Sequence, residues 1–507
     1  VVCRQTSGME SKTPVYEWTV DLKGKDGRGR TYMEVAESIC VAVIHSASWC
    51  SFAFPRIPRY RMLGQASHTQ GRGYARCLGI AAIGWAAPGA WALKRGRAAE
   101  IHSSCHTPIS FEEFVERYGR DYVLGTDEYN ERARVFAARV AAINEHNCGS
   151  HSGHTWRAGI NNLADWSEDA LAGLSGSHHA APQEVPGAAG DAQAAGGSEL
   201  EPYSFLSQRG RRKIFPTSVS WGHLSAIRVP RHQGHCGSCW ALTAVTVINA
   251  HSEIRNVASD YSVSQVVACT PNPNRCGGKG GCHGATAGLA FNYAMHAGLV
   301  SEKTFPYPYG DRSFRPRSEK EELSCPTSMA VDPSVTELSL QAVFAPDGSQ
   351  VHRVSRQTPS YRAGREFSMV GWKRLAENKE QQIVQALVEE GPMAVSVSTG
   401  PDWHIYDGGV FPSESCDPDR VIRHATVLFG YGMDEVWSLR YWHLKNSWGE
   451  DWGEFGNMRL ERLDNEEAAC GWDPHPEKGS ECAGGRSRVW VCGSCSLIHE
   501  ATIPLFD

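Results

Sequence analysis

The stretch from Cys239 to Ile254 constrains the fold most, because its residues are mostly Ala, Val, Leu and Ile and are apolar on every side. A helix of this kind is enclosed by protein, so the chain must build a core around it. Directly before it stands Gln233-Gly-His-Cys236-Gly-Ser-Cys239-Trp240. Cys239 is therefore predicted to open a buried helix, where unsatisfied backbone N–H groups favour the thiolate that attacks carbonyl carbon.

Gln233 offers a second catalytic part, because its side-chain N–H and the backbone N–H of Cys239 can together hold a developing oxyanion. Cys236 and Cys239 also form a C-x-x-C pair, which occurs in redox sites and in half of a zinc site. A second pair, Cys492-Gly-Ser-Cys495, could complete a four-thiolate site. A zinc ribbon keeps its pairs close in sequence, however, and the βαβ context of a redox pair is absent. We therefore expect neither metal nor cofactor.

A thiol nucleophile needs a base, and the base needs an orienting group. Residues 421–432 form a β-branched segment that enters a Gly-rich turn, and residues 441–453 form a second strand pattern that ends in a turn. Joined by a short loop, the two would pair antiparallel and bring His424 and Asn446 onto one face. Asn446 would then fix the imidazole tautomer, while His424 exchanges a proton with Cys239.

Taken together, these segments resemble the papain family of cysteine proteases, the clan of cathepsins L, B and H. In that family the cysteine of C-G-S-C-W is the nucleophile, the upstream Gln lines the oxyanion hole, and the Asn of N-S-W orients the His. The resemblance implies that Cys239, Gln233, His424 and Asn446 are the catalytic residues. It also implies that Trp448 shields the His–Asn hydrogen bond from water.

Residues 214–507 carry further segments in family order, including residues 215–221, which resemble the start of a mature enzyme. The implied fold is α+β and two-lobed, with a helical left lobe and an antiparallel, β-barrel-like right lobe. Residues 281–286 lie where the family has its Gly-rich substrate wall, and small residues suggest a pocket for an apolar side chain. The substrate-binding residues implied in this way are Gly284, Ala285, Thr286, Ser396 and Trp448.

Three departures from the family pattern affect the expected site. Gly284 is followed by Ala285 instead of a second glycine, which would narrow the cleft. Arg423 precedes His424 where the family more often has Asn or Asp, so we expect a positive charge to depress the pKa of the imidazole. The polar, Arg-rich residues 350–366 are interpreted as a surface insertion.

Upstream lies a second unit, marked by polar and apolar residues spaced four, four, three, four and four positions apart along one helix face. Spacing alone fits an ordinary amphipathic helix. The residue identities resemble the E-R-F-N-I-N pattern of cathepsin L-like propeptides, and residues 159–165 resemble the accompanying G-x-N-x-F-x-D. By that resemblance residues 107–172 form a mainly helical inhibitory prodomain, whose tail runs through the cleft against the substrate direction. The helix-face residues are Glu128, Arg132, Phe136, Arg139, Ile143 and Asn147.

The segment between the two units, residues 173–213, is predicted to be a flexible linker that contains the activation site. Residues 175–200 are rich in Ala, Gly, Pro and Ser without periodicity. Arg209-Gly-Arg-Arg-Lys213 is a candidate processing site, and a solvated charge run is the alternative interpretation.

Cysteine usage indicates an oxidising compartment. Of the 17 cysteines, 11 lie from Cys236 onward, and setting aside Cys239 leaves ten, enough for five disulfides. We therefore expect the secretory pathway, ending in an acidic lysosome- or vacuole-like compartment or outside the cell. The formal charge of −6 and a pI near 6.4 give no basic footprint for nucleic acid. The resemblance implies the pairs Cys236–Cys282 and Cys269–Cys325, and Cys416 with a C-terminal cysteine.

Export predicts a leader, and residues 77–92 have a basic flank, a short apolar core and an A-x-A ending. A signal peptide is our interpretation and a signal anchor the alternative, so we expect membrane contact only if this segment stays as an anchor. Met62 is then a candidate start. Residues 1–76 are unassigned, and an extension of the gene model is one interpretation of them.

The sequence thus predicts a monomeric cysteine endopeptidase that hydrolyses protein or peptide substrates through a thioester acyl-enzyme. It is made as a zymogen inhibited by its own propeptide. The loop between Cys276 and Cys282 is too short for the occluding loop of cathepsin B-like exopeptidases. The alternative is a catalytically inactive papain-like binding scaffold, which predicts a missing catalytic group where none is missing.

Overall fold

The structure is a computed structural model that divides into two compact units, residues 1–95 and residues 96–507. Most of the expected linker and of the expected signal segment lies outside the described residues. The residues that the structure describes are 2–6, 15–21, 74–80, 109–149, 154–175, 215–257, 260–310, 323–331, 343–353 and 369–506.

The first unit contains a three-stranded antiparallel sheet in the order β1-β2-β3. Its strands are β1 (Val2–Thr6), β2 (Val15–Asp21) and β3 (Tyr74–Ile80). β3 includes the first four residues of the expected signal segment, and residues 81–92 lie outside the described part. Among the described residues no helix combines the length and the apolar character needed to cross a bilayer.

The second unit begins with the prodomain, and its two main helices have well-formed N-termini. A capping box joins Ser110 and Glu113 at the start of α3, and the Thr126 side chain caps α4. Of the six residues on the expected helix face, Phe136 and Ile143 are buried on α4, whereas Glu128 is exposed. The prodomain elements are α3 (Phe111–Arg117), α4 (Asp127–Cys148), β4 (Trp156–Ala158) and α5 (Glu168–Leu174).

A buried ion pair ties the prodomain together. Arg120 donates from Nε and Nη2 to the two carboxylate oxygens of Asp165, at 3.0 and 2.8 Å, and both side chains are almost fully buried. The Tyr122 hydroxyl donates to the same carboxylate at 2.7 Å. From α4, Arg132 donates to the Asp165 carbonyl at 3.1 Å. Asp165 thus fixes the turn before α5 against the helical part of the prodomain.

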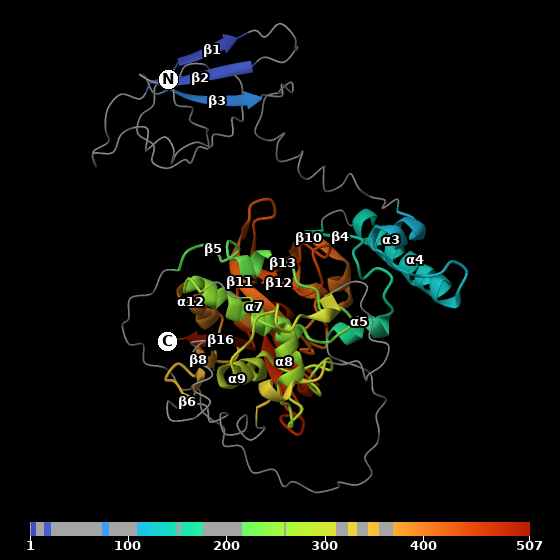
Figure 1. Ribbon diagram of the computed structural model, residues 1–507, viewed down its shortest axis with the longest axis vertical. Coiled ribbons are helices and arrows are strands. Elements are labelled where there is room, and N and C mark those ends of the chain that lie inside the picture. The colour runs from blue at the N-terminus through green and yellow to red at the C-terminus, as the bar shows by residue number, and fades with distance from the viewer. Residues whose placement is uncertain are drawn as a thin grey trace. The chain divides into compact units, whose positions relative to one another are not determined.

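The helical lobe of residues 214–507 is built around α7 (Cys239–Ile254), whose residues are buried from Cys239 through Ser252. This burial on all sides is the environment that the apolar run predicted. α7 packs against α9 and against strand β11 (Figure 1). The other helices of this lobe are α6 (Ser225–Arg228), α8 (Val263–Cys269) and α9 (Ala287–Ala297).

The second lobe is built on a mixed sheet in the order β4-β10-β13-β12-β11-β9-β16-β8-β7-β6, with β5 also paired to β11. This order is an open path and not a closed barrel, and β10 pairs with β13 in parallel. The α+β class is confirmed. The peptidase strands are β5 (Val219–Ser220), β6 (Val343–Phe344), β7 (Gln350–Arg353), β8 (Met369–Arg374), β9 (Met393–Val397), β10 (Tyr406–Phe411), β11 (His424–Asp434), β12 (Leu439–Lys445), β13 (Asn457–Glu461) and β16 (Ala501–Phe506).

The remaining described elements are short, apart from one helix that packs on the sheet. α12 (Glu380–Glu389) buries Ile383, Val384 and Leu387. A separate hairpin pairs β14 (Cys470–Asp473) with β15 (Val489–Cys492). The 3-10 turns are η1 (Pro308–Gly310), η3 (Thr327–Met329), η4 (Pro401–Ile405), η5 (Ser413–Ser415), η6 (Glu466–Ala468), η7 (Pro476–Lys478) and η8 (Ser494–Ser496).

The start of the expected surface insertion is part of the sheet. Residues 350–353 form β7, which pairs antiparallel with β8, and the His352 ring stacks on Trp372 with ring centroids 3.9 Å apart. β7 also pairs with β6 on its other side, so it lies inside the sheet, and His352 is buried here. Residues 354–366 lie outside the described part.

Five disulfides brace the peptidase unit. Cys236–Cys282 and Cys269–Cys325 are the two pairs that the family resemblance implied. The other three are Cys416–Cys495, Cys276–Cys482 and Cys470–Cys492.

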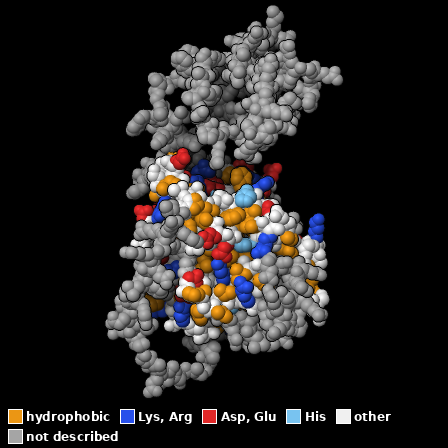
Figure 2. All heavy atoms as spheres, turned by 90° about the vertical axis from the view of Figure 1, so that its left-hand side faces the viewer, with side chains coloured by type: hydrophobic (Ala, Val, Ile, Leu, Met, Phe, Trp, Pro, Cys, Tyr) orange, Lys and Arg blue, Asp and Glu red, His pale blue; other side chains and the backbone are white. Residues whose placement is uncertain are grey.

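On the face seen in Figure 2, acidic and basic side chains alternate with hydrophobic ones, and neither sign of charge dominates.

Replacing Arg120 by Met should destabilise the prodomain by about 3–5 kcal/mol, because the buried Asp165 carboxylate would lose its charged partner. The measurement is amide hydrogen exchange of α3 and α4 in full-length protein, with Cys239→Ala included to prevent self-cleavage.

The matched control is Arg134→Met, which removes an exposed i,i+3 ion pair with Glu131 on the same helical layer. We expect no measurable change in exchange for this variant. Equal losses of protection in the two variants would contradict a structural role for the buried pair.

Candidate active site

Cys239 is the first residue of α7, and its side chain is 4% exposed. Cys236 is tied to Cys282, so the two cysteines of the C-x-x-C pair have different states, one in a disulfide and one free. The free thiol lies beside the backbone N–H of Ala425, the residue that follows His424. Because Cys236 is already bonded to Cys282, this C-x-x-C pair does not offer two thiols to a metal or to each other.

His424 and Asn446 are brought together by strand pairing, as their positions predicted. β11 pairs antiparallel with β12, and Val427 lies opposite Lys445. His424 Nε2 and Asn446 Oδ1 are 2.8 Å apart, and both residues are buried. This contact leaves Nδ1 of His424 without a hydrogen-bond partner among the described residues. Nδ1 is thus the nitrogen available for exchange with a thiol.

Aromatic rings surround this dyad. The centroids of the His424 and Trp448 rings are 5.0 Å apart, and Trp403 approaches His424 edge-on at 6.4 Å. Trp403 and Trp448 are fully buried. The His–Asn hydrogen bond is therefore kept in a dry environment, where it is stronger than in water.

Burial moves the pKa values of the thiol and the imidazole apart. It raises the pKa of Cys239 to about 11, although nearby backbone N–H groups oppose the change. It lowers the pKa of His424 to about 4, against the effect of the Asn446 hydrogen bond. At neutral pH both groups are therefore uncharged in this structure. Burial outweighs the helix N-terminus, whose effect on a neighbouring charge is usually about 1 kcal/mol or less.

The side-chain amide of Gln233 is fixed at both ends. Ser447 donates its hydroxyl to Oε1 at 2.8 Å, while Nε2 donates to the carbonyl of Cys236 at 2.9 Å. The same Nε2 donates to the carbonyl of Leu174, in the prodomain, at 2.7 Å. The donor expected to hold an oxyanion therefore already holds a carbonyl oxygen.

The prodomain reaches this point by following the second lobe. β4 pairs antiparallel with β10, which adds a prodomain strand to the edge of the sheet. Asn161 then donates to the His404 carbonyl and Asn162 to the Trp448 carbonyl, both at 2.8 Å. Leu174 ends α5, where carbonyl groups lack helical partners and carry partial negative charge. The prodomain thus presents such a carbonyl to Gln233.

The expected substrate wall is only partly free to contact a ligand. Gly284 has φ = +85°, which suits glycine, and Ala285 is buried beside it in the cluster that contains Cys239. Thr286 caps α9 with its side chain, accepting from Leu289 N at 3.3 Å. That side chain is therefore occupied as a helix cap.

Ser396, also expected to contact substrate, lies opposite Ala425 on the neighbouring strand. Its hydroxyl donates to the Glu500 carboxylate at 2.8 Å. Glu500 is buried, and burial raises its pKa. Arg374 lies 3.8 Å from this carboxylate.

Arg423 does not act as expected. It forms an ion pair with Asp417, which holds the charge away from the imidazole that follows it in sequence. The lowered pKa of His424 comes first from burial. The expectation that Arg423 lowers the pKa of His424 was wrong, because Asp417, six positions upstream, pairs with the guanidinium.

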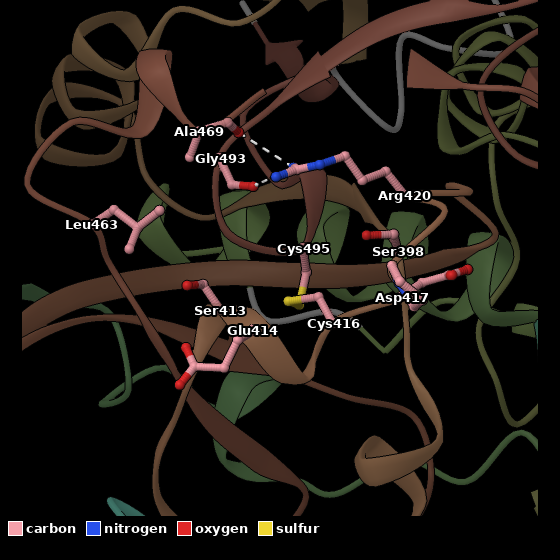
Figure 3. Close-up of a pocket in the computed structure, with 11 residues that line it drawn as sticks. Ser398, Ser413, Glu414, Cys416, Asp417, Arg420, Leu463, Ala469, Gly493 and Cys495 are labelled. Atoms are coloured by element: carbon pink, nitrogen blue, oxygen red, sulfur yellow. Dashed lines mark hydrogen bonds between the residues drawn. A yellow bond between two sulfur atoms is a disulfide. The ribbon is translucent and has the colours of Figure 1, made fainter. Parts of the chain in front are cut away.

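A cavity of about 250 Å³ lies beside the Cys416–Cys495 disulfide, and neither Cys239 nor His424 lines it (Figure 3). Arg420 reaches across it and donates to the carbonyls of Ala469 and Gly493, at 3.2 and 3.4 Å. These bonds hold the loop that leads into His424. We interpret the cavity as part of the support of that loop.

Sequence reasoning missed Ser447 and Leu174. Ser447 stands inside the quoted Asn-Ser-Trp segment, but its role depends on pairing between residues 231–233 and 447–449. That pairing is shown by the bond from Gln233 N to Ser447 O at 2.8 Å and from Gly449 N to Arg231 O at 2.9 Å. Leu174 carried no local signal, because its contact with Gln233 is made by its backbone carbonyl.

Comparison with known proteins agrees with this geometry. The model of the papain family of cysteine proteases matches residues 215–477, and that of the cathepsin propeptide inhibitor domain (I29) matches residues 111–171. The chain belongs to the papain family of cysteine proteases. It is a cysteine endopeptidase made with an inhibitory propeptide.

Relatives include the senescence-specific cysteine protease SAG12 of Arabidopsis thaliana, 26% identical over 71% of this chain and 86% of that protein. Mouse pro-cathepsin H is 26% identical over 76% of this chain and 96% of its own length. Among solved structures, digestive procathepsin L2 from the larval midgut of Tenebrio molitor has a TM-score of 0.51 at 22% identity. The aligned part covers 78% of this chain and 98% of the procathepsin chain. That likeness concerns the fold.

Alkylation of Cys239 in the intact precursor should be slow at neutral pH and should rise about tenfold per pH unit toward pH 11. The reason is that only the thiolate reacts and the pKa of this thiol is raised to about 11. The measurement is the rate of iodoacetamide labelling, read at the peptide that contains Cys239 by mass spectrometry. A rate that is flat between pH 5 and pH 9 would instead indicate a thiolate–imidazolium pair in the precursor.

Proposed function

We propose that Cys239 is the nucleophile, His424 the general acid and base, Asn446 its orienting residue and Gln233 the oxyanion donor of this endopeptidase. One observation carries the proposal: Gln233 Nε2 donates to the carbonyl of Leu174 at 2.7 Å. A carbonyl held there, beside a free thiol at a helix start, occupies the place of a carbonyl under attack.

In the first half-reaction the Cys239 sulfur attacks the scissile carbonyl carbon, and its proton passes to Nδ1 of His424. The oxyanion accepts hydrogen bonds from Gln233 Nε2 and the backbone N–H of Cys239. As the C–N bond breaks, the imidazolium gives its proton to the leaving amine, and a thioester remains.

In the second half-reaction neutral His424 takes a proton from water, and the resulting hydroxide oxygen attacks the thioester carbonyl. The C–S bond then breaks, the acid product leaves, and the sulfur regains its proton. Asn446 keeps Nδ1 turned toward the sulfur throughout, because its Oδ1 holds Nε2 at 2.8 Å. Trp448 shields that contact by its position next to the imidazole.

The prodomain inhibits by filling this cleft. Its strand β4 is fixed to β10, and Arg157 forms an ion pair with Asp407 at the same edge. The backbone N–H of Gly159 donates to the Ile405 carbonyl at 2.8 Å. A side chain at position 159 would collide with Asp407, so glycine allows this close approach. Activation then requires a cut downstream, for which residues 173–213 and the basic cluster at 209–213 are the candidates.

The substrates that we propose are proteins or peptides with an apolar side chain facing Ala285 and its neighbours. The chain would act as a monomer after entry into the secretory pathway, in an acidic lysosome- or vacuole-like compartment or outside the cell. Five disulfides support passage through an oxidising compartment.

Cys239→Ala should abolish turnover after activation, and Gln233→Ala should lower kcat about 100- to 1,000-fold, since it removes one oxyanion donor. Ser447→Ala should have a smaller effect on kcat with KM little changed, because Ser447 acts by orienting Gln233. The measurement is steady-state hydrolysis of a fluorogenic peptide, with active sites counted by an epoxide probe that labels Cys239.

As a control, Ser301→Ala changes an exposed serine outside the cleft and should leave kcat unchanged. If Gln233→Ala labels fully with the epoxide and turns over at the wild-type rate, Gln233 is not the oxyanion donor. If wild-type protein is folded and processed but neither labels nor hydrolyses any peptide, the proposed site is wrong.

A further inference from the structure

Trp166 of the prodomain lies flat on the ring of His235. The two ring centroids are 4.0 Å apart and the planes differ by 5°. Trp166 is only 3% exposed, because it also packs in a hydrophobic cluster that includes Leu171 and Leu174. Neither ring has a part in the proposed hydrolysis. A tightly stacked pair at the contact between inhibitor and enzyme therefore needs another explanation.

The loop that carries His235 begins beside the segment that contacts His424. Residues 231–233 run beside residues 447–449, as the bonds Gln233 N to Ser447 O and Gly449 N to Arg231 O show. Trp448 in that second segment contacts His424, which protonates the leaving amine in the proposed mechanism. His235 follows Gln233 by two residues and so continues this side of the site.

The loop that carries His235 is held rigidly. Gly234 has φ = +62°, and a Cβ there would meet the carbonyl oxygen of Tyr309 at 2.1 Å. Its N–H donates to Nδ1 of His232 at 2.8 Å. On the other side Cys236 is locked to Cys282. A ring fixed in this way loses little freedom when a ligand stacks on it.

The path of the prodomain places Trp166 where a substrate side chain could lie. Asn162 contacts the Trp448 carbonyl, Trp166 covers His235, and Leu174 reaches Gln233. The prodomain thus touches the leaving-group side and then the oxyanion donor. Once it departs, the face of His235 now under the indole becomes available to substrate.

We propose that His235 forms the floor of a subsite on the leaving-group side of the scissile bond that takes an aromatic side chain of the substrate. Trp166 fills that subsite in the precursor. This inference rests on the proposed function, because it assigns one specificity contact to the same cleft. Stacked aromatic pairs of this kind typically change binding by about two- to tenfold.

The protein is expressed as the full-length precursor and then activated. The epoxide probe counts the active sites. Internally quenched peptides share one sequence on the acyl side and carry Ala, Leu, Phe or Trp at each of the first three positions after the scissile bond. The wild type should prefer Phe or Trp over Ala about two- to tenfold in kcat/KM at one of these positions. His235→Ala should lose that preference, and His235→Phe, which keeps a flat ring, should retain it.

His223→Ala is the matched control, since His223 is an exposed histidine outside the cleft, and it should keep the wild-type preference. Equal aromatic preference in wild type and His235→Ala would overturn the inference. A second set of peptides varies the residues on the acyl side of the scissile bond instead. A preference that depends on His235 and is found only in this second set would also overturn the inference. If no peptide is cleaved and no site is labelled, the proposed function has failed instead, so the two failures are distinguishable.

Discussion

The register of β11 against its neighbours is the constraint on which the site depends. β12 on one side sets Val427 opposite Lys445, and β9 on the other sets His424 opposite Val397. A slip of one residue would turn the His424 side chain to the opposite face of the sheet. Because Asn446 directly follows β12, the same register also places its amide 2.8 Å from the imidazole. Main-chain pairing therefore builds the dyad, and the aromatic rings around it preserve its geometry.

The prodomain contacts the same groups that we propose for catalysis. The prodomain first attaches by strand addition, β4 onto β10, in which backbone hydrogen bonds supply much of the contact. It then offers the end of α5 to Gln233, whose donor is oriented by Ser447. An oxyanion donor cannot distinguish a helix-end carbonyl from a substrate carbonyl by charge alone. What prevents turnover is the chain around that carbonyl, which β4 and the Asp165 ion pair hold in a fixed path.

Features that depend on residues close together in the sequence were predicted better than contacts between residues far apart in the chain. The apolar run gave α7 its bounds, Cys239–Ile254, because burial on all sides depends on neighbouring residues in one helix. The face of α4 was predictable for the same reason. The packing of His352 on Trp372, the Cys276–Cys482 pair and the role of Ser447 depend on partners farther along the chain. The effect of Arg423 was misjudged because its partner, Asp417, is brought to it by a loop.

Burial links the state of the catalytic pair to the presence of the prodomain. Desolvation is the largest cause of both the raised pKa of Cys239 and the lowered pKa of His424. The prodomain lies next to this pair, as the Leu174 contact with Gln233 shows. When the prodomain leaves, we expect water to return and to reduce this desolvation, so that the two pKa values move toward each other. The helix N-terminus then acts on a thiol that is no longer shielded, so release of the prodomain both opens the cleft and favours the ionised nucleophile.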